Sequence, residues 1–207
     1  MTQETFNPAE QFLLRQWSDA RRLEMAMEST RQKYQGVWER IQERIAQEHP
    51  DLDWSRLYVK QFWSKGSAGF GRKTWPGADK EWAPGIWFDN VRLEVLSDPD
   101  EPPPEAYLWI KPLAKAGVNP EGVIAAGARA LARMTPEQKS SSGLAAADGD
   151  SALSCAMPPK GELLDMLLQR DSQPFIDAIM ARVAALATFT SLIDDAVQGA
   201  KGQRTKA

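Results

Sequence analysis

The side chains that most often carry catalysis are scarce in this sequence. Its 207 residues include one histidine, His49, and one cysteine, Cys155, far apart along the chain. Zinc sites use sets of several Cys and His ligands, and a nucleophilic cysteine needs a nearby base, so neither is indicated here. The neighbouring carboxylates Asp194 and Asp195 point to different faces of a helix. The sequence therefore predicts no metal site and no cofactor, and it favours a protein that is not an enzyme.

A glycine-rich segment resembles a phosphate-binding loop without completing it. Residues 66–74 read GSAGFGRKT. In the phosphate-binding loop the lysine directly follows the second key glycine and a helix begins there, so that backbone N–H groups point at the phosphate. Here Arg72 precedes Lys73, and the sequence WPG at 75–77 does not begin a helix. We expect a loop that connects two strands, and we do not expect nucleotide hydrolysis.

The predicted order of elements, a helix, three strands and further helices, is also that of the PD-(D/E)XK nuclease core. That chemistry needs an Asp on the second strand and a Glu-x-Lys on the third to hold a metal ion. Asp89 could supply the first, but residues 109–111 read WIK, with Trp in place of the carboxylate. Element order alone is an analogy. The missing acid argues against an active nuclease, and an enzyme of unrecognised type is left as the weaker alternative.

The same glycine-rich region is basic and aromatic. Residues 56–82 contain six Lys or Arg and two acids, whereas residues 89–105 contain six acids and one Arg. Basic residues interleaved with aromatic rings are typical of contact with single-stranded nucleic acid. The alternative is that the two segments neutralise each other across a sheet. The candidate nucleic-acid or partner-binding residues are Lys65, Arg72, Lys73, Trp75, Lys80 and Trp82.

The first 50 residues predict a long helix. Asn7 can cap it, Pro8 suits the first helical position, and Glu10 can complete a capping box. The helical pattern runs to about Ala46, and Pro50 ends it. Its apolar residues recur at steps of three and four, at Leu13, Trp17, Ala20, Met27, Tyr34, Trp38, Ile41 and Ile45.

This apolar seam is interrupted at Glu24 and Arg31, so the sequence does not decide which surface the helix packs against. A helix of nearly 40 residues exceeds the length usual in globular proteins and indicates an arm. The arm could pack within its own chain or self-associate. A hairpin of two helices broken near residues 29–30 is the other interpretation.

Three strands are predicted between residues 57 and 111. Residues 57–63 are rich in aromatic and β-branched side chains, residues 91–95 alternate apolar and charged, and residues 106–110 are apolar on both faces. Residues 89–90 indicate a bulge or a hairpin turn after 86–88. We expect the core residues Trp63, Ile86, Phe88, Val91, Leu93, Val95, Leu108, Ile110, Ile179, Val183, Leu186 and Ile193.

Helices follow the strands. A capped helix is predicted over 119–134, a short helix over 162–169, and a long amphipathic helix over 172–199. Residues 140–150 contain little to bury, and we expect a mobile loop there. Strands grouped between helical blocks favour an α+β fold.

Composition bounds the class of protein. Hydrophobic residues make up 43% and charged residues 26%, which is typical of a globular domain with a core. The net charge of −3 gives no overall attraction to nucleic acid or membranes. We see no uninterrupted apolar span and no secretory signal, and the lone cysteine fits a reducing compartment. These features predict a cytoplasmic protein that does not contact a membrane.

Tryptophan is unusually frequent, and its role is left open. Eight occur, and six lie between Trp54 and Trp109. Trp carries a large apolar area and one N–H donor. The cluster is either an aromatic core beneath a small sheet or a platform that stacks on a ligand.

These observations predict an α+β protein with a long N-terminal helix, a small antiparallel sheet of about three strands, and C-terminal helices packed on that sheet. We expect a helix or hairpin over 1–50, an α+β domain over 51–199 (sheet 57–111, helices 119–199) and a flexible tail over 200–207. The predicted function is non-enzymatic binding, with a protein partner or self-association through the N-terminal helix. Contact with nucleic acid through the 64–82 loop is the alternative.

Overall fold

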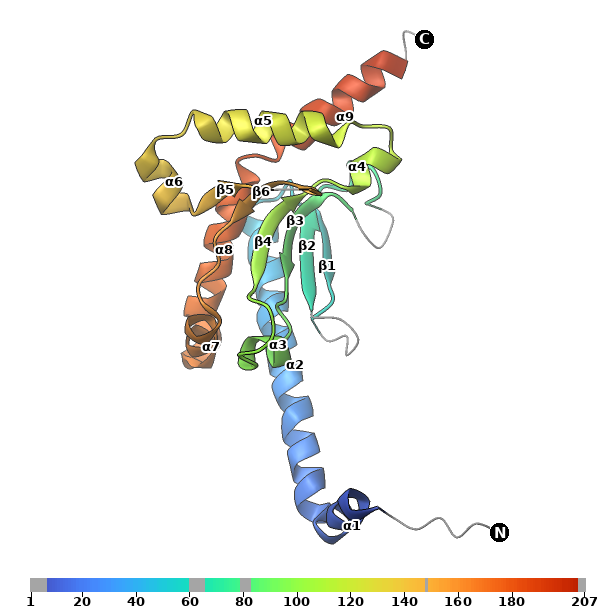
Figure 1. The fold of residues 1–207 in the computed structure, drawn as a ribbon, viewed down its shortest axis with the longest axis vertical. Helices are drawn as coiled ribbons and strands as arrows, with labels where there is room; N and C mark the ends of the chain where they lie inside the picture. The colour runs from blue at the N-terminus through green and yellow to red at the C-terminus, as the bar shows by residue number, and fades with distance from the viewer. Residues whose placement is uncertain (1–6, 60–65, 79–82, 148, 205–207) are drawn as a thin grey trace, which may run out of the picture.

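One antiparallel sheet organises the part of the chain that we describe. A computed structural model describes residues 7–59, 66–78, 83–147 and 149–204. Its strands lie in the order β1-β2-β3-β4-β6-β5 and all pair antiparallel. Figure 1 shows a long helix running behind the sheet, with shorter helices beside it and across one end of the sheet. The strands are β1 (Trp54–Leu57), β2 (Ser67–Gly71), β3 (Gly85–Asp89), β4 (Glu105–Trp109), β5 (Leu144–Ala146) and β6 (Ser151–Cys155).

Strand register assigns each side chain to one of two faces, because successive residues point to opposite sides. Phe88 pairs with Ala68 and Ala106, and these apolar side chains share one face. Trp87 pairs with Gly69 and Tyr107 and so points to the other face. The first face carries the main core, and the second carries a smaller aromatic cluster.

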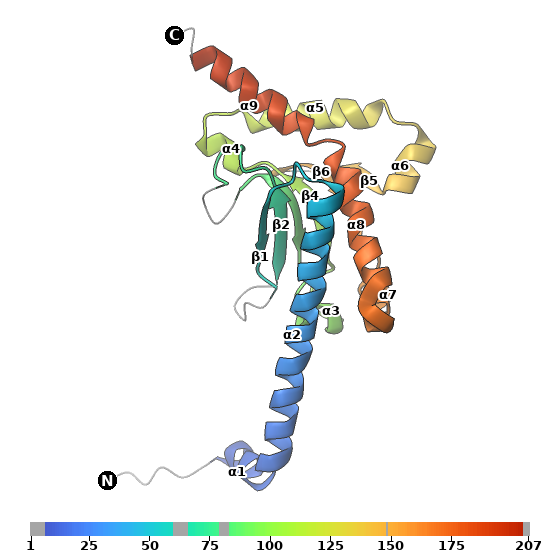
Figure 2. The same ribbon diagram turned by 180° about the vertical axis from the view of Figure 1, so that it is seen from behind.

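Helices cover the first face. The long helix α2 and the helix α8 run side by side along it, as both views show (Figures 1 and 2). Helix α5 crosses one end of the sheet and contacts β6 and α9. The helices are α1 (Pro8–Arg15), α2 (Trp17–Glu48), α3 (Leu93–Ser97), α4 (Pro112–Lys115), α5 (Pro120–Ala132), α6 (Pro136–Ser142), α7 (Lys160–Leu168), the 3-10 turn η1 (Arg170–Ser172), α8 (Gln173–Ala187) and α9 (Ser191–Arg204).

The second half of α2 belongs to the main core. Trp38 is fully buried, and its ring lies 5.9 Å from that of Phe88 on the sheet and 6.1 Å from that of Phe175 on α8. Ile41 and Ile45 continue this buried stripe one and two turns further along. The stripe follows from the three- and four-residue spacing of these side chains, which places them on one face of a helix.

The mixed helical and antiparallel character is confirmed, but the prediction of about three strands is wrong. Six strands are present, and β5 and β6 lie C-terminal to the predicted sheet. Residues 91–95 do not form the predicted strand, because α3 begins at Leu93. Val91 and Val95 are both buried, and their four-residue spacing suits a helical turn as well as a strand. The predicted strand at 57–63 is also displaced, since β1 ends at Leu57.

Two helical predictions also need correction. The N-terminal helix breaks at Gln16 and runs unbroken through residues 29–30, where a hairpin was the alternative. The predicted helix over 172–199 is two helices, α8 and α9, separated at 188–190 and extending past Gly199. Residues 140–150 were predicted to be a mobile loop, yet they contain β5 and the end of α6.

The predicted core is largely confirmed. Of the twelve side chains, ten are buried and Leu93 is half-buried. Trp63 lies outside the described residues. Ile86 and Leu108 sit opposite each other in adjacent strands, which is the cross-strand contact that stabilises a sheet.

One helical stretch could cross a membrane by length and composition alone. It covers Arg170–Lys201, and 44% of its most apolar window is buried within the structure. Ile179, Val183 and Leu186 of this stretch belong to the main core. A core helix of this kind passes the same test, so the finding is weak evidence for a span.

Burial of Tyr34 predicts a loss of stability at alkaline pH. Its hydroxyl donates a hydrogen bond to the carbonyl oxygen of Val91, and burial raises the pKa of this phenol well above its usual value. Because the pKa is higher in the folded chain, the stabilisation is fully present below the unfolded pKa of about 10 and is lost as pH rises above it. We expect the free energy of unfolding to fall above about pH 10, and to fall less steeply in Tyr34→Phe.

Urea unfolding between about pH 8 and pH 11 measures both slopes. Tyr34→Phe should cost about 1–3 kcal/mol at neutral pH, because the buried Val91 carbonyl loses its donor. Burial and Asp89 also raise the pKa of Tyr107, so the variant keeps part of the alkaline loss. Equal slopes in the two proteins would contradict the prediction.

Candidate protein-interaction site

An arm projects from one end of the fold. We define the arm as residues 7–30, which comprise α1 and the first half of α2 (Figures 1 and 2). Among its described side chains, only Ala20 is even partly buried. The arm ends where Arg31 forms an ion pair with Glu94 of α3, at 2.7 Å between Nε and Oε1. Beyond that point the helix enters the core.

Local sequence explains the shape of the arm. The Asn7 side chain accepts a hydrogen bond from the Glu10 backbone, and Glu10 accepts one from the Asn7 backbone, so the predicted capping box is present. At Gln16 the backbone leaves the helical region, with φ −108° and ψ 25°, and the chain turns. Helix α2 then starts at Trp17 and is held from Tyr34 onward by the core. The exposed half is therefore a continuation of an anchored helix.

Large apolar side chains are concentrated on the arm. Phe12 is 64% exposed, Trp17 62% and Met25 65%, and Leu14, Leu23 and Met27 are also exposed. Seven large apolar side chains are exposed in the described part of the chain, and Leu168 alone of these lies outside the arm. Single exposed apolar residues need no explanation, but a concentration of this kind marks an interaction surface.

Three arm residues continue the buried stripe of α2. Counting back from Tyr34 by three and four residues leads through Arg31 to Met27, Leu23 and Ala20. They lie on the face that the sheet covers further along the helix, and Trp17 lies at its edge. We call Ala20, Leu23 and Met27 the docking face. Met25 lies on the opposite side of the helix.

The arm contains three Arg and four acidic residues, which give it a net charge of −1, and these charges are unevenly placed. Arg21, Glu24 and Glu28 follow at steps of three and four, so they share one edge of the docking face. Arg22 lies 3.7 Å from Asp19, in an exposed pair within the helix. With no excess of basic charge, the arm lacks the electrostatic footprint of a nucleic-acid-binding helix.

No protein-family model, no curated protein and no solved structure matches this chain.

The prediction of a loop over the glycine-rich segment is wrong in part, because residues 67–71 form the strand β2. The candidate residues of the 64–82 segment lie in different surroundings. Trp75 is only 3% exposed, and its Nε1 donates to Asp194 of α9 at 2.7 Å. Arg72 lies over the Trp75 ring at 5.7 Å and forms ion pairs with Asp51 and Asp194. Both side chains therefore join this loop to α9. Lys73 is exposed, while Lys65, Lys80 and Trp82 lie outside the described residues. Nucleic-acid contact through this loop stays a prediction.

Arg72 holds two segments of the fold together, and its substitution should lower the free energy of unfolding. Arg72→Ala leaves Asp51 and Asp194 without this partner and removes the cation over the Trp75 ring. Charge-assisted hydrogen bonds are stronger than neutral ones, but this site is partly exposed, so we expect a loss of about 2 kcal/mol.

The neighbouring variant Lys73→Ala is the control for this prediction. Lys73 is exposed, so its truncation should change the free energy of unfolding by less than about 0.5 kcal/mol. Urea unfolding of both variants measures the difference. Similar small losses in the two proteins would show that the Arg72 ion pairs contribute little.

The second face of the sheet holds most of the described tryptophans from the predicted cluster. Trp54 and Trp87 are buried, with ring centroids 5.8 Å apart, and Trp109 packs against Trp87 at 5.6 Å. Tyr107 donates a hydrogen bond to Asp89 beside them. A shallow hollow of about 720 Å³ adjoins Tyr107 and Trp109. The rings mainly pack on one another, which supports the interpretation of an aromatic core for this part of the cluster.

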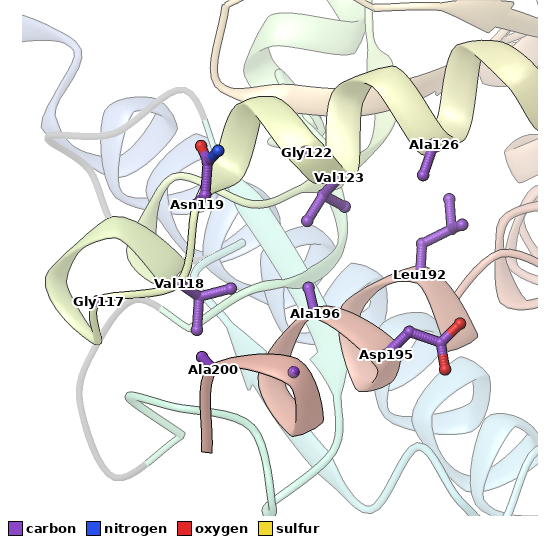
Figure 3. Close-up of a pocket in the computed structure, with 11 residues that line it drawn as sticks. Gly117, Val118, Asn119, Gly122, Val123, Ala126, Leu192, Asp195, Ala196 and Ala200 are labelled. Atoms are coloured by element: carbon purple, nitrogen blue, oxygen red, sulfur yellow. The ribbon is translucent and has the colours of Figure 1, made fainter. Parts of the chain in front are cut away.

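A second hollow lies between α5 and α9, with a volume of about 370 Å³ (Figure 3). Ala126 and Leu192 point toward each other across it. Its polar members are few, and Asn119 already accepts a hydrogen bond from the backbone of Glu121 as the cap of α5. This lining is typical of packing between two helices that approach through small side chains.

Metal ligands do not gather in the described part of the chain. No group of three His, Cys, Asp or Glu residues there could hold a metal ion. Cys155 is buried, its thiol lies 3.1 Å from the carbonyl oxygen of Ser142, and burial raises its pKa, which disfavours the reactive thiolate. His49 ends α2, where its backbone N–H donates to the carbonyl oxygen of Ile45. Neither residue stands in a constellation for acid–base chemistry.

Sequence reasoning named two of the three docking-face residues and missed Leu23. The predicted seam named Trp17, Ala20 and Met27, but it passed over Leu23, because Leu23 does not fall on the strict seven-residue repeat. A 3.6-residue period centred on Tyr34 and Trp38 includes Leu23. The exposed Phe12 and Leu14 on α1 carry no signal beyond their apolar character, since α1 is too short to establish a period.

Proposed function

We propose that this protein is a non-enzymatic binding or accessory protein whose arm contacts a protein partner. The observation that carries the proposal is the concentration of exposed Phe, Leu, Trp and Met side chains on a helix that projects from the fold. An amphipathic helix that presents apolar residues at three- and four-residue steps is a recurring mode of protein recognition. The anchored second half of α2 supports the mode, because a pre-formed helix loses little conformational entropy on binding.

The exposed area and the charge of the arm support the same proposal. Binding through an apolar face requires exposed area and shape, both of which the arm offers. The net charge of −1 on the arm favours a protein surface over a phosphate backbone as its target.

Photo-crosslinking in the cells where the protein occurs tests the proposal. A photoreactive residue at Leu23 should give a discrete adduct on illumination, because the docking face is in contact with its partner. The same residue at Glu137, which is exposed on α6 far from the arm, is the matched control and should give no discrete adduct. Mass spectrometry of the adduct then gives the mass of the partner. Equal yields at the two positions, or no adduct at Leu23, would contradict the proposal.

A further inference from the structure

We infer that the partner of the arm is a second copy of this chain, and that the two arms pair antiparallel about Leu23. This inference rests on the proposed function, because it names the occupant of the docking face. It is drawn from four features of the arm, namely its spacing of large and small side chains, its polarised edge, the position of its break and its exposed area.

The first feature is the fit of the docking face to its own copy. In an antiparallel pair about a two-fold axis near Leu23, the two Leu23 side chains meet at the centre. Met27 of each copy then lies opposite Ala20 of the other, so a large side chain meets a small one at both ends. Such alternation allows the faces of two helices to interdigitate. A parallel pair would place Ala20 on Ala20 and leave a gap.

The second feature is charge. The same axis places Arg21 of one copy between Glu24 and Glu28 of the other, and the reverse pair forms by symmetry. These residues lie at the edge of the docking face, where ion pairs select the orientation and the partner. Exposed pairs contribute little to affinity, so their role here is selection of the arrangement.

The third feature is where the helix breaks. In the antiparallel pair, Gln16 of one copy lies opposite Arg31 of the other. Arg31 is the point at which the helix enters its own fold and its ion pair with Glu94 closes the exposed segment. A straight continuation of the partner helix beyond that point would meet α3 and the sheet. Helix α2 instead begins at Trp17, after the break at Gln16, so it does not continue straight into this obstruction.

A parallel pair of arms would be blocked by the same part of the fold. From Tyr34 onward the face of α2 that carries the docking residues is covered by the sheet of its own chain. In a parallel pair the two folded domains would lie at the same end. They would clash there, because each domain covers the face of α2 that would have to meet the partner helix. The antiparallel arrangement places the folds at opposite ends of the pair.

The fourth feature is area. The paired segment, residues 17–30, is about 21 Å long. Trp17, Leu23 and Met27, with Phe12 and Leu14 from α1, offer roughly 100 Å² each, so the pair buries on the order of 1,000 Å². This is near the lower limit for a specific interface. We therefore expect a dimer that dissociates at micromolar concentration, not a permanent one.

Sedimentation of the full chain tests the association. From about 1 to about 200 µM, the average mass should rise from that of one chain, 23.0 kDa, toward twice that value. Leu23→Asp combined with Met27→Asp should stay monomeric and retain its circular dichroism. Met25→Asp, an equally exposed apolar position on the opposite face, should dimerise like the natural chain. A natural chain that stays monomeric throughout, or equal behaviour of the two variants, overturns the inference.

Disulfide trapping tests the orientation. Ala20→Cys and Met27→Cys are prepared as separate proteins, one carrying a mass tag, and mixed under mild oxidation. The antiparallel pair predicts a mixed disulfide, which joins the thiol introduced at position 20 of one protein to the thiol introduced at position 27 of the other. This product should form in at least several-fold excess over the disulfide of either protein alone. Predominant like-with-like disulfides would overturn the antiparallel arrangement.

Charge reversal gives an independent check on register. Arg21→Glu should weaken dimerisation several-fold, since it places like charges opposite Glu24 and Glu28 of the partner. Adding Glu24→Arg and Glu28→Arg to the same chain should restore it. A further loss on adding these changes would contradict the proposed axis.

The photo-crosslink at Leu23 separates this inference from the proposed function. An adduct at twice the mass of the chain supports both. An adduct of any other mass leaves the arm as an interaction site and overturns the second copy as its occupant. No adduct, together with a monomer in sedimentation, overturns both.

Discussion

Trp38→Ala should lower the free energy of unfolding by about 3–5 kcal/mol. The indole is fully buried and lies between the sheet and α8, with ring contacts to Tyr34, Phe88 and Phe175. Truncation removes these contacts and leaves a cavity that three neighbouring aromatic rings cannot fill without moving. Because a small domain is stable by only about 5–15 kcal/mol, a loss of this size brings the variant close to unfolding.

Trp17→Ala is a matched control, with the same residue type on the same helix. Trp17 is 62% exposed, so its truncation should change the free energy of unfolding by less than about 0.5 kcal/mol. Urea unfolding is best measured at low protein concentration, where association of the arm adds least to stability. A loss at Trp38 no greater than that at Trp17 would show that the second half of α2 is not part of the core.

The sheet was only partly predictable, because its last two strands carry little intrinsic strand propensity. β5 and β6 are built from Leu, Ala, Ser and Cys. They form a hairpin because Ser154 can pair with Tyr107 of β4 on one side and with Ala145 on the other. Pairing of this kind is decided by an existing sheet edge, and local sequence does not report it.

Short apolar segments were ambiguous for a different reason. Val91, Leu93 and Val95 alternate with polar residues, which predicts a strand. The chain instead buries Val91, Val95 and Leu96 and begins a five-residue helix. A spacing of four residues serves both structures, so burial of two of these positions could not distinguish them. Longer segments, such as α2 and α5, avoid this ambiguity because their period repeats.

In the candidate site, too, some features depend on one helix alone and could be predicted, whereas others depend on distant segments of the chain. The capping box at Asn7 and the three- and four-residue seam were visible in the sequence, because both are properties of one helix. Which part of that helix is covered depends on where the sheet ends, and this is remote information. For Arg72, the basic charge was visible, but its acidic partners Asp51 and Asp194 lie in distant segments of the chain.

Gly66→Ala should be strongly destabilising although it adds only one methyl group. Gly66 immediately precedes β2 and has a φ of +80°, which L-residues rarely adopt. An added Cβ would lie 2.4 Å from the backbone nitrogen of Arg92. Backbone cannot rotate away as a side chain can, so the two segments must separate. Their separation would break the hydrogen bond from the Val91 N–H to the Gly66 carbonyl oxygen, at 3.2 Å.

Gly149→Ala separates the effect of φ from the effect of the contact. Gly149 has a similar φ of +67°, but an added Cβ there meets nothing within 4 Å. We expect Gly149→Ala to cost about 1–2 kcal/mol for the left-handed conformation alone. Gly66→Ala should exceed about 4 kcal/mol, because the clash with the Arg92 backbone is added to that strain. Thermal and urea unfolding measure both losses. Equal losses at the two positions would mean that the approach of Gly66 to Arg92 is loose enough to admit a methyl group, and that the end of the sheet beside α3 is not closely packed.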